Sequence, residues 1–231
     1  MNAIRRSALE AVHDRLGARW VSDALRWPVS YGDEAVESAA VREAIGLAEE
    51  GPLDKMSLTG PIAEQAAAAI AGRPLPPGNV AVTTVEAGIV EIWSVAPDEA
   101  LVIAEPRLVA VRSRLETVGA TIVDMSSAFT VLRLGGPGLP PLLEELTPAD
   151  LRESSFPDGR LTHAPVAGVR GVIGRLRGVV TILVARDEAE YLWGAIVRLG
   201  RPHGLVPVGP AAMSARAGAP AVDRRAREPV R

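Results

Sequence analysis

Cysteine is absent from this 231-residue sequence, and Lys55 is its only lysine. Without cysteine the protein has no disulfides, no thiolate nucleophile and no cysteine-ligated metal. The three histidines, His13, His163 and His203, are scattered, and no pair has the spacing of metal ligands on a helix. We therefore expect no metal site. We expect ordinary surface or capping roles for the histidines, with His13 beside Asp14 on the solvated side of a first helix.

Aromatic side chains make up only 3% of the chain although 48% is hydrophobic, so the core has to be mainly aliphatic. The net charge of -3 does not resemble the basic footprint of a nucleic-acid-binding protein. No run approaches the roughly 20 apolar residues needed to span a bilayer. No apolar region follows the arginines near the N-terminus, as it would in a secretory signal. We therefore expect a cytoplasmic protein with neither nucleic acid nor membrane as partner.

One local pattern occurs twice in the chain. Residues 55–61 form an alternating run that ends in Gly-Pro, and an alanine-rich helical stretch follows at 62–71. Residues 129–137 end in the same way and precede a helical stretch at 139–146. Proline in the first turn of a helix loses no needed hydrogen bond, and glycine tolerates a sharp strand-to-helix corner. Two such corners with similar sequels indicate a duplicated unit.

The sequels are a hairpin, a helix and a closing strand in each case. The first set is 87–95 with 100–104, then 106–118, then 120–123; the second is 169–176 with 179–185, then 187–199, then 205–208. The proline in the last strand predicts an edge position. Each half therefore has the ferredoxin-like order strand, helix, strand, strand, helix, strand. The fold class that follows is α+β, with two fused ferredoxin-like (βαββαβ) halves and mostly antiparallel sheets.

The rest of the chain completes a four-part division. We predict an N-terminal helical and loop segment at 1–54 packed on the first half, halves at 55–125 and 126–210, and a disordered tail at 211–231. Within the first segment a helix is expected at 34–47. The acidic pairs Glu49-Glu50 and Glu144-Glu145 have the appearance of solvated helix ends.

Several short motifs follow one another in a recognisable order between residues 7 and 210. They are Trp27-Pro28-Val29-Ser30-Tyr31-Gly32, Leu58-Thr59-Gly60-Pro61, Gly88-Ile89-Val90, Leu132-Arg133-Leu134-Gly135-Gly136-Pro137 and His203-Gly204-Leu205-Val206-Pro207-Val208-Gly209. Their order resembles that of the aminomethyltransferase family, typified by the glycine-cleavage T-protein. The resemblance implies tetrahydrofolate in a central cavity between the halves, where a carboxylate positions the substrate amine during one-carbon transfer.

The resemblance also implies candidate site residues. The family takes its carboxylate from an acidic pair after a Gly-Gly-Ile-Val-like strand, and the matching positions here are Glu91 and Ile92. Glu91 is therefore the candidate catalytic residue, although it also fits a polar position on the outer face of an alternating strand. Trp27, Tyr31 and Trp93 are the candidates for cofactor stacking, because large amphipathic aromatics are common in ligand contacts.

Three departures from the family pattern argue for weakened or lost catalysis. Residues 176–180 carry neither the tyrosine nor the acid of the family's Gly-Tyr-Thr-Gly-Glu-like segment, and residues 209–214 lack its arginine and aspartate. We also expect the family's C-terminal barrel domain to be absent. A ring that needs several convergent donors and acceptors loses affinity and orientation when these are missing.

Two functions are left open, and with them whether the protein is an enzyme. The first is a truncated aminomethyltransferase-like, folate-binding-domain protein linked to one-carbon or methylamine (glycine or sarcosine) metabolism. The alternative is a non-catalytic subunit similar to the gamma subunit of sarcosine oxidase, which residues 123–127 and 155–159 resemble. That alternative implies flavin-dependent amine oxidase subunits as partners.

Overall fold

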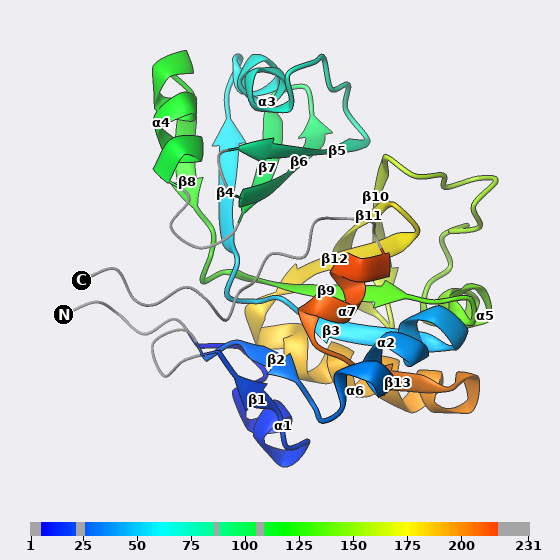
Figure 1. The fold of residues 1–231 in the computed structure, drawn as a ribbon. Coiled ribbons are helices and arrows are strands. Elements are labelled where there is room, and N and C mark those ends of the chain that lie inside the picture. The colour runs from blue at the N-terminus through cyan, green and yellow to red at the C-terminus, as the bar shows by residue number, and fades with distance from the viewer. Residues whose placement is uncertain (1–5, 22–25, 86–87, 105–108, 217–231) are drawn as a thin grey trace.

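The structure is a computed structural model that describes residues 6–21, 26–85, 88–104 and 109–216 (Figure 1). Its strands are β1 (Arg19–Trp20), β2 (Pro28–Ser30), β3 (Ile45–Glu49), β4 (Asp54–Thr59), β5 (Asn79–Val85), β6 (Gly88–Ala96), β7 (Glu99–Ala104), β8 (Thr121–Asp124), β9 (Phe129–Gly135), β10 (Arg160–Val166), β11 (Val169–Leu176), β12 (Val179–Ala185) and β13 (Leu205–Pro207). Its helices are α1 (Glu10–Arg15), α2 (Glu34–Glu43), α3 (Ala63–Ala71), α4 (Val109–Val118), α5 (Leu139–Leu146), α6 (Ala189–Gly200) and α7 (Pro210–Arg216), with short 3-10 turns at Arg186–Glu188 and Arg201–His203.

The described residues form a mixed α+β protein around one mostly antiparallel sheet. Eleven strands follow the order β13-β3-β9-β12-β11-β10-β5-β6-β7-β4-β8, and β1 pairs with β2 in a separate ribbon. Within the large sheet, β6-β7-β4-β8 in one part corresponds to β11-β12-β9-β13 in the other, except that β3 lies between β9 and β13. The pattern that occurs twice in the sequence therefore corresponds to a strand order that occurs twice in the sheet.

Most of the expected strands and helices of the two halves are present at the expected places. The strand β13 lies at the end of the sheet, as its proline predicts. Ala87 of the first expected hairpin and residues 106–108 of the following helix lie outside the described residues. The corner glycine Gly136 has φ 137°, and a Cβ there would lie 2.0 Å from the backbone oxygen of Ala44. Glycine is therefore required at this corner by both conformation and space.

The N-terminal segment differs from its expected form and placement. The helix expected at 34–47 ends at Glu43, and β3 begins at Ile45 and pairs with β9 and β13 rather than with a strand of the first half. Every residue of β3 is buried, so both of its faces are covered and it lacks the alternation that usually marks a strand. The division of the chain into domains stays a prediction.

The end of the described chain also differs from the expected disordered tail. Helix α7 occupies Pro210–Arg216 and packs against α2, with Ala212 and Met213 buried. Residues 217–231 of the expected tail lie outside the described residues. This segment has too few apolar side chains to show a helical period in the sequence. In the structure, Ala212 and Met213 pack against apolar side chains of β3 and α2.

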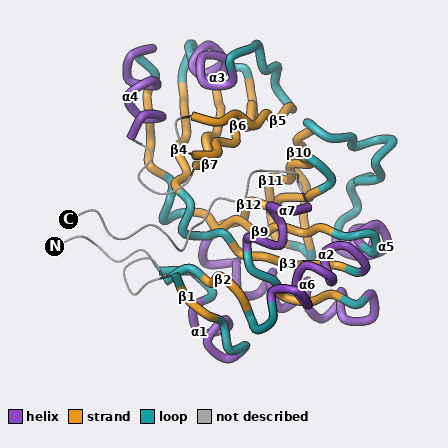
Figure 2. The backbone as a smooth tube through the Cα atoms, viewed as in Figure 1, coloured by secondary structure: helices purple, strands orange, loops and turns teal. Residues whose placement is uncertain are grey.

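Helices α3, α4, α5 and α6 cover one face of the sheet; the other face forms an inner core, with α2 and α7 packed on that side at β3. Figure 2 shows α3 and α4 at one end of the molecule and α5 and α6 at the other, with the strands between. Because successive strand residues point to opposite faces, Ile92 packs with α3 and α4 while Trp93 packs inward. The inner core contains Trp27, Leu53, Val80, Trp93, Leu101, Ile103, Val131, Leu161 and Leu183, contributed by both parts of the sheet.

Candidate functional site

A polar cluster lies on the inner face of the sheet, where the two parts of the sheet meet. It contains Glu91 of β6, Arg133 of β9, Thr181 of β12 and Glu50, which directly follows β3. We call these four residues the central polar cluster. Each strand places its member inward by alternation: Val131, two residues before Arg133, belongs to the inner core, and Leu132 to the core under α5 and α6.

Arg133 connects the other three residues. Its Nη2 lies 2.7 Å from Oε1 of Glu91, its Nε donates to Oε2 of Glu50 over 2.8 Å, and its Nη1 donates to Oγ1 of Thr181 over 2.9 Å. The Arg133, Glu50 and Glu91 side chains are only 12%, 4% and 11% exposed. One guanidinium therefore joins strands of both parts of the sheet through nearly buried ion pairs.

The charges of this cluster stabilise one another. Burial opposes the charge on Arg133, but Glu50 and Glu91 outweigh it and hold the pKa of the guanidinium above its ordinary value. The second oxygen of Glu91, Oε2, accepts a 3.2 Å hydrogen bond from Nε1 of Trp93. Both carboxylate oxygens of Glu91 are thus engaged by protein donors, which places this acid in the buried network and not on a solvated outer face.

A second buried polar group surrounds His13. The histidine is fully buried, and its ring makes edge contacts with Trp20, Tyr31 and Trp193. Its Nδ1 lies 2.8 Å from the Tyr31 hydroxyl and its Nε2 lies 3.5 Å from Oε2 of Glu49. The solvated position expected for His13 is therefore wrong, because three aromatic rings cover the face of α1 that carries it.

Glu49 and Glu50 are also buried, at 0% and 3% exposure, and are not a solvated helix end. Glu49 accepts a 2.7 Å hydrogen bond from the backbone N–H of Gly51. Burial raises the pKa of the Tyr31 hydroxyl far above its ordinary value, and the carboxylates of Glu49 and Glu37 add to that rise. Tyr31 therefore acts as a neutral hydrogen-bonding group at all physiological pH values.

Replacing Tyr31 with phenylalanine tests this buried contact. We expect the Tyr31→Phe variant to lose about 1 kcal/mol of unfolding free energy, because His13 Nδ1 loses its partner in a buried site. Urea denaturation measures the difference. The chain's other tyrosine supplies a matched control, since Tyr191 is 60% exposed and its hydroxyl bonds only at the surface. Equal effects of Tyr31→Phe and Tyr191→Phe would contradict the assignment.

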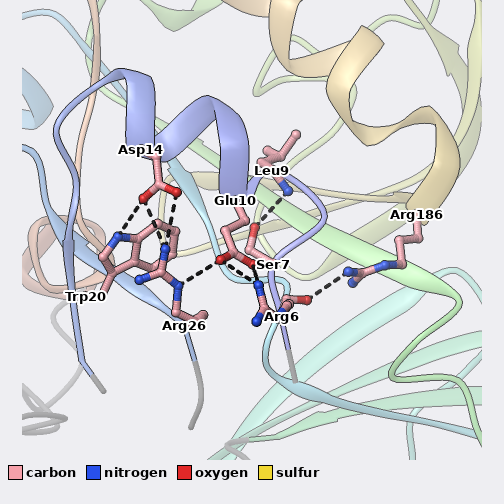
Figure 3. Close-up of polar contacts among 8 residues, drawn as sticks. All are labelled: Arg6, Ser7, Leu9, Glu10, Asp14, Trp20, Arg26 and Arg186. Atoms are coloured by element: carbon pink, nitrogen blue, oxygen red, sulfur yellow. Dashed lines mark hydrogen bonds and ion pairs between the residues drawn. The ribbon is translucent and has the colours of Figure 1, made fainter. Parts of the chain in front are cut away.

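A surface network secures α1 to the loop before β2 (Figure 3). Arg26 donates through Nε to Glu10 over 2.9 Å and through Nη2 to Asp14 over 3.1 Å, and its guanidinium lies 4.2 Å from the centre of the Trp20 ring. Trp20 itself donates to Oδ1 of Asp14 over 3.0 Å. These acids are paired within the network, which indicates a structural role at the surface.

Within the described ranges, no group of three or more histidine, cysteine, aspartate or glutamate side chains is placed to hold a metal ion. In the same ranges no helix has the length and apolar character to cross a membrane. His203, which ends the last 3-10 turn, lies 2.8 Å from Oε1 of Glu145, and His163 is exposed on β10.

Comparison with known proteins gives the family. The sequence model of the GCVT N-terminal domain family matches residues 9–219. The chain belongs to this family. Its relatives include the aminomethyltransferases of Streptomyces avermitilis, 31% identical over 90% of this chain and 60% of the relative, and of Streptomyces coelicolor, 30% identical over 89% and 60%. The motif resemblance is confirmed, and the chain spans about 60% of the length of these relatives.

Two solved structures share the GCVT-type fold. The glycine cleavage system aminomethyltransferase T of Bartonella henselae superposes with a TM-score of 0.71 at 17% identity. The matched region is 92% of this chain and 61% of the Bartonella chain. A chain of the heterotetrameric sarcosine oxidase from Corynebacterium sp. U-96 has a TM-score of 0.61 at 24% identity, with 75% of this chain and 93% of that chain covered. At these identities the likeness concerns the fold.

Two of the three residues predicted as cofactor contacts, Trp27 and Trp93, do not fit a stacked tetrahydrofolate ring, and Tyr31 is half-buried. Trp93 is fully buried and Trp27 is 3% exposed, so both rings are part of the inner core and present no face to a ligand. The Tyr31 hydroxyl is used by His13. Glu91, the candidate carboxylate, is engaged on both oxygens. Trp27, Trp93 and Glu91 are therefore all used in contacts within the protein.

The residues that complete the cluster were missed in the sequence. Arg133 is a single charge inside the apolar run Val131-Leu132-Arg133-Leu134, and a lone charge in a strand buried on both faces signals a paired inner position. Glu50 follows a strand that has no alternation, so no local signal in the sequence indicates its burial beside Arg133. Of the predicted residues, Glu91 and Trp93 lie in contact, Trp27 joins Trp93 in the inner core, and Tyr31 belongs to the His13 group.

Proposed function

We propose that this protein is an aminomethyltransferase-like domain, built from two ferredoxin-like halves, whose catalysis is weakened or lost. We place it in the cytoplasm and in one-carbon or methylamine (glycine or sarcosine) metabolism. The observation that supports weakened catalysis is the engagement of Glu91 by Arg133 and Trp93. A carboxylate acts on a substrate amine only if it comes within hydrogen-bonding reach of it, about 2.6–3.2 Å.

The pairing places a barrier before any such contact. A substrate would have to displace either the 2.7 Å contact to Arg133 or the hydrogen bond from Trp93. Displacing Arg133 leaves a nearly buried guanidinium with one carboxylate fewer, and breaking a buried pair costs about 3–5 kcal/mol. A cost of that size lowers a rate by a factor of about 150 to 5,000. The geometry therefore favours a structural use of Glu91.

Titration with tetrahydrofolate tests this proposal. We expect calorimetry to show no saturable heat up to about 1 mM ligand. A dissociation constant of about 1 mM corresponds to a binding free energy of only about −4 kcal/mol. The matched variants are Glu91→Ala and Glu64→Ala, the latter removing an exposed acid of α3. Saturable binding that disappears in Glu91→Ala and persists in Glu64→Ala would overturn the proposal, because Glu91 would then be available to a ligand.

A second candidate function rests on a different observation. A chain of the heterotetrameric sarcosine oxidase shares the fold over 93% of its length, with a TM-score of 0.61. This likeness supports a non-catalytic, gamma-like subunit that works through protein contacts, with flavin-dependent amine oxidase subunits as partners. Purification of the tagged protein from its own cells tests this alternative. Co-purification of a flavin-containing amine oxidase supports it, and a protein that elutes alone as a monomer contradicts it.

A further inference from the structure

The structure contains a cavity that the proposed function does not use. It has a volume of about 700 Å³ and lies between α5, the loop after it and the end of β11. Cavities of roughly 300–1,000 Å³ are the usual size of small-molecule sites. Arg175 of β11 shares a face of that strand with Ile173, which packs under α5 and α6, so the sheet separates this cavity from the central polar cluster.

The cavity has apolar walls and one cationic group without a carboxylate partner. Leu139, Leu143 and Leu151 are buried residues of the lining, and Pro140 and Pro148 add apolar surface. Arg175 donates through Nη2 to the carbonyl of Leu151 over 2.6 Å. Its Nε is buried without a hydrogen-bond partner among the residues that the structure describes, and no carboxylate there lies within ion-pair distance.

The second guanidinium of the lining is already neutralised. Arg152 contacts Asp150 through two hydrogen bonds, of 2.8 and 2.6 Å. The Cζ of Arg175 lies over the Phe156 ring, 6.0 Å from its centre. Burial lowers the pKa of the Arg175 guanidinium, against the opposing charges of Asp158 and Glu153, although an arginine stays charged at neutral pH. Arg175 is thus a partly desolvated cation that a ligand anion would stabilise.

We propose that this cavity binds a small apolar monocarboxylate, with the carboxylate at Arg175 and the apolar body against the leucines of α5 and its following loop. One N–H of Nη2 is used by the Leu151 carbonyl, so the carboxylate would be held by the remaining N–H donors of the guanidinium, in a charge-assisted contact. The exposed acids Glu144 and Glu153 line the same cavity, so ligands with several negative charges are disfavoured at its mouth. A single charge on an apolar body fits both features.

Calorimetric titration with octanoate tests the site, with 1-octanol and octylamine as ligands of the same length. We expect octanoate to bind with a dissociation constant below about 1 mM. We expect Arg175→Met to weaken this binding at least about tenfold, as loss of a charge-assisted contact does. The matched control is Arg170→Met, which removes an exposed arginine of the same strand and is expected to bind like the wild type.

A third variant leaves Arg175 unchanged and alters an exposed residue at the mouth of the cavity. Glu153→Gln removes a carboxylate whose charge acts on Arg175, and we expect it to tighten octanoate binding about two- to fivefold. Circular dichroism verifies that each variant is folded. If Arg175→Met fails to fold, Glu153→Gln and the ligand series decide. Absence of saturable octanoate binding up to about 5 mM, equal binding of octylamine, or unchanged affinity in Glu153→Gln would overturn the proposal.

Discussion

Replacing Arg133 with methionine is expected to lower the free energy of unfolding by about 3–5 kcal/mol. The substitution keeps much of the apolar stem but removes the guanidinium that pairs with Glu50 and Glu91, whose side chains are 4% and 11% exposed. Two carboxylates would then face each other across the inner face of the sheet without this cation. Removing one partner of a buried pair costs more than the pair contributes, because the remaining charge has lost its water as well.

The pH dependence of this variant follows from the same loss. Without Arg133 the carboxyl groups of Glu50 and Glu91 are nearly buried beside each other, an arrangement that favours their neutral, protonated forms in the folded state. The folded variant then binds more protons than the unfolded chain, so its stability falls as the pH rises. We expect the difference from the wild type to be largest near neutral pH and to shrink below roughly pH 5.

Urea denaturation at several pH values measures both effects. The control is Arg170→Met, an exposed position on β11 where we expect a change within about 0.5 kcal/mol. Adding Glu50→Gln and Glu91→Gln to Arg133→Met should recover part of the loss, since the unpaired charges are then gone. If Arg133→Met is as stable as the control at pH 7, the cluster is not a buried ion network.

Replacing Trp93 with alanine is expected to cost about 3–5 kcal/mol, the range found when a large aromatic is removed from a core. Trp93 is fully buried and packs with Val131 and Leu183, so its ring joins the two parts of the sheet. A Cβ on Gly174 would approach this ring to 3.1 Å, which shows how closely β11 fits against it. Its indole N–H also bonds to Glu91.

Two variants separate these contributions. Trp93→Phe keeps most of the ring and loses the hydrogen bond, so we expect a smaller loss than in Trp93→Ala. Tyr191→Ala removes an aromatic that is 60% exposed, and we expect a change within about 0.5 kcal/mol. Thermal and urea unfolding provide the comparison. A loss in Trp93→Ala no larger than in Tyr191→Ala would mean that the inner core does not hold the two parts together.

The repeated elements were predictable because their signals are local. The Gly-Pro corners, the hairpins and the helix at 187–199 depend on glycine, proline and apolar periods within a few residues of each element. Helix α5 occupies Leu139–Leu146, as expected, and α3 begins at Ala63, one residue after the start expected for it. Element boundaries depend on the hydrogen bonds that the folded chain finally makes.

The N-terminal strand and the burial of the site residues were not predictable in this way. Ile45–Glu49 has no alternation because α2 and α7 cover one face and the core under α5 and α6 covers the other. Trp27 follows an arginine in a loop-like sequence and still enters the inner core. His13 is adjacent to the exposed Asp14, and only the rings of Trp20, Tyr31 and Trp193 make its surroundings apolar.

Local pattern and motif order were enough to establish the repeat, the mixed α+β class and the family, because each of these is written in neighbouring residues or in their order along the chain. The state of Glu91 depended on the tertiary structure alone. Arg133 is far from Glu91 in sequence, and nothing near position 91 indicates that β9 brings this guanidinium, already paired with Glu50, within ion-pair distance of Glu91. Whether a carboxylate is available to a ligand is decided by its partners, and strand pairing supplies them.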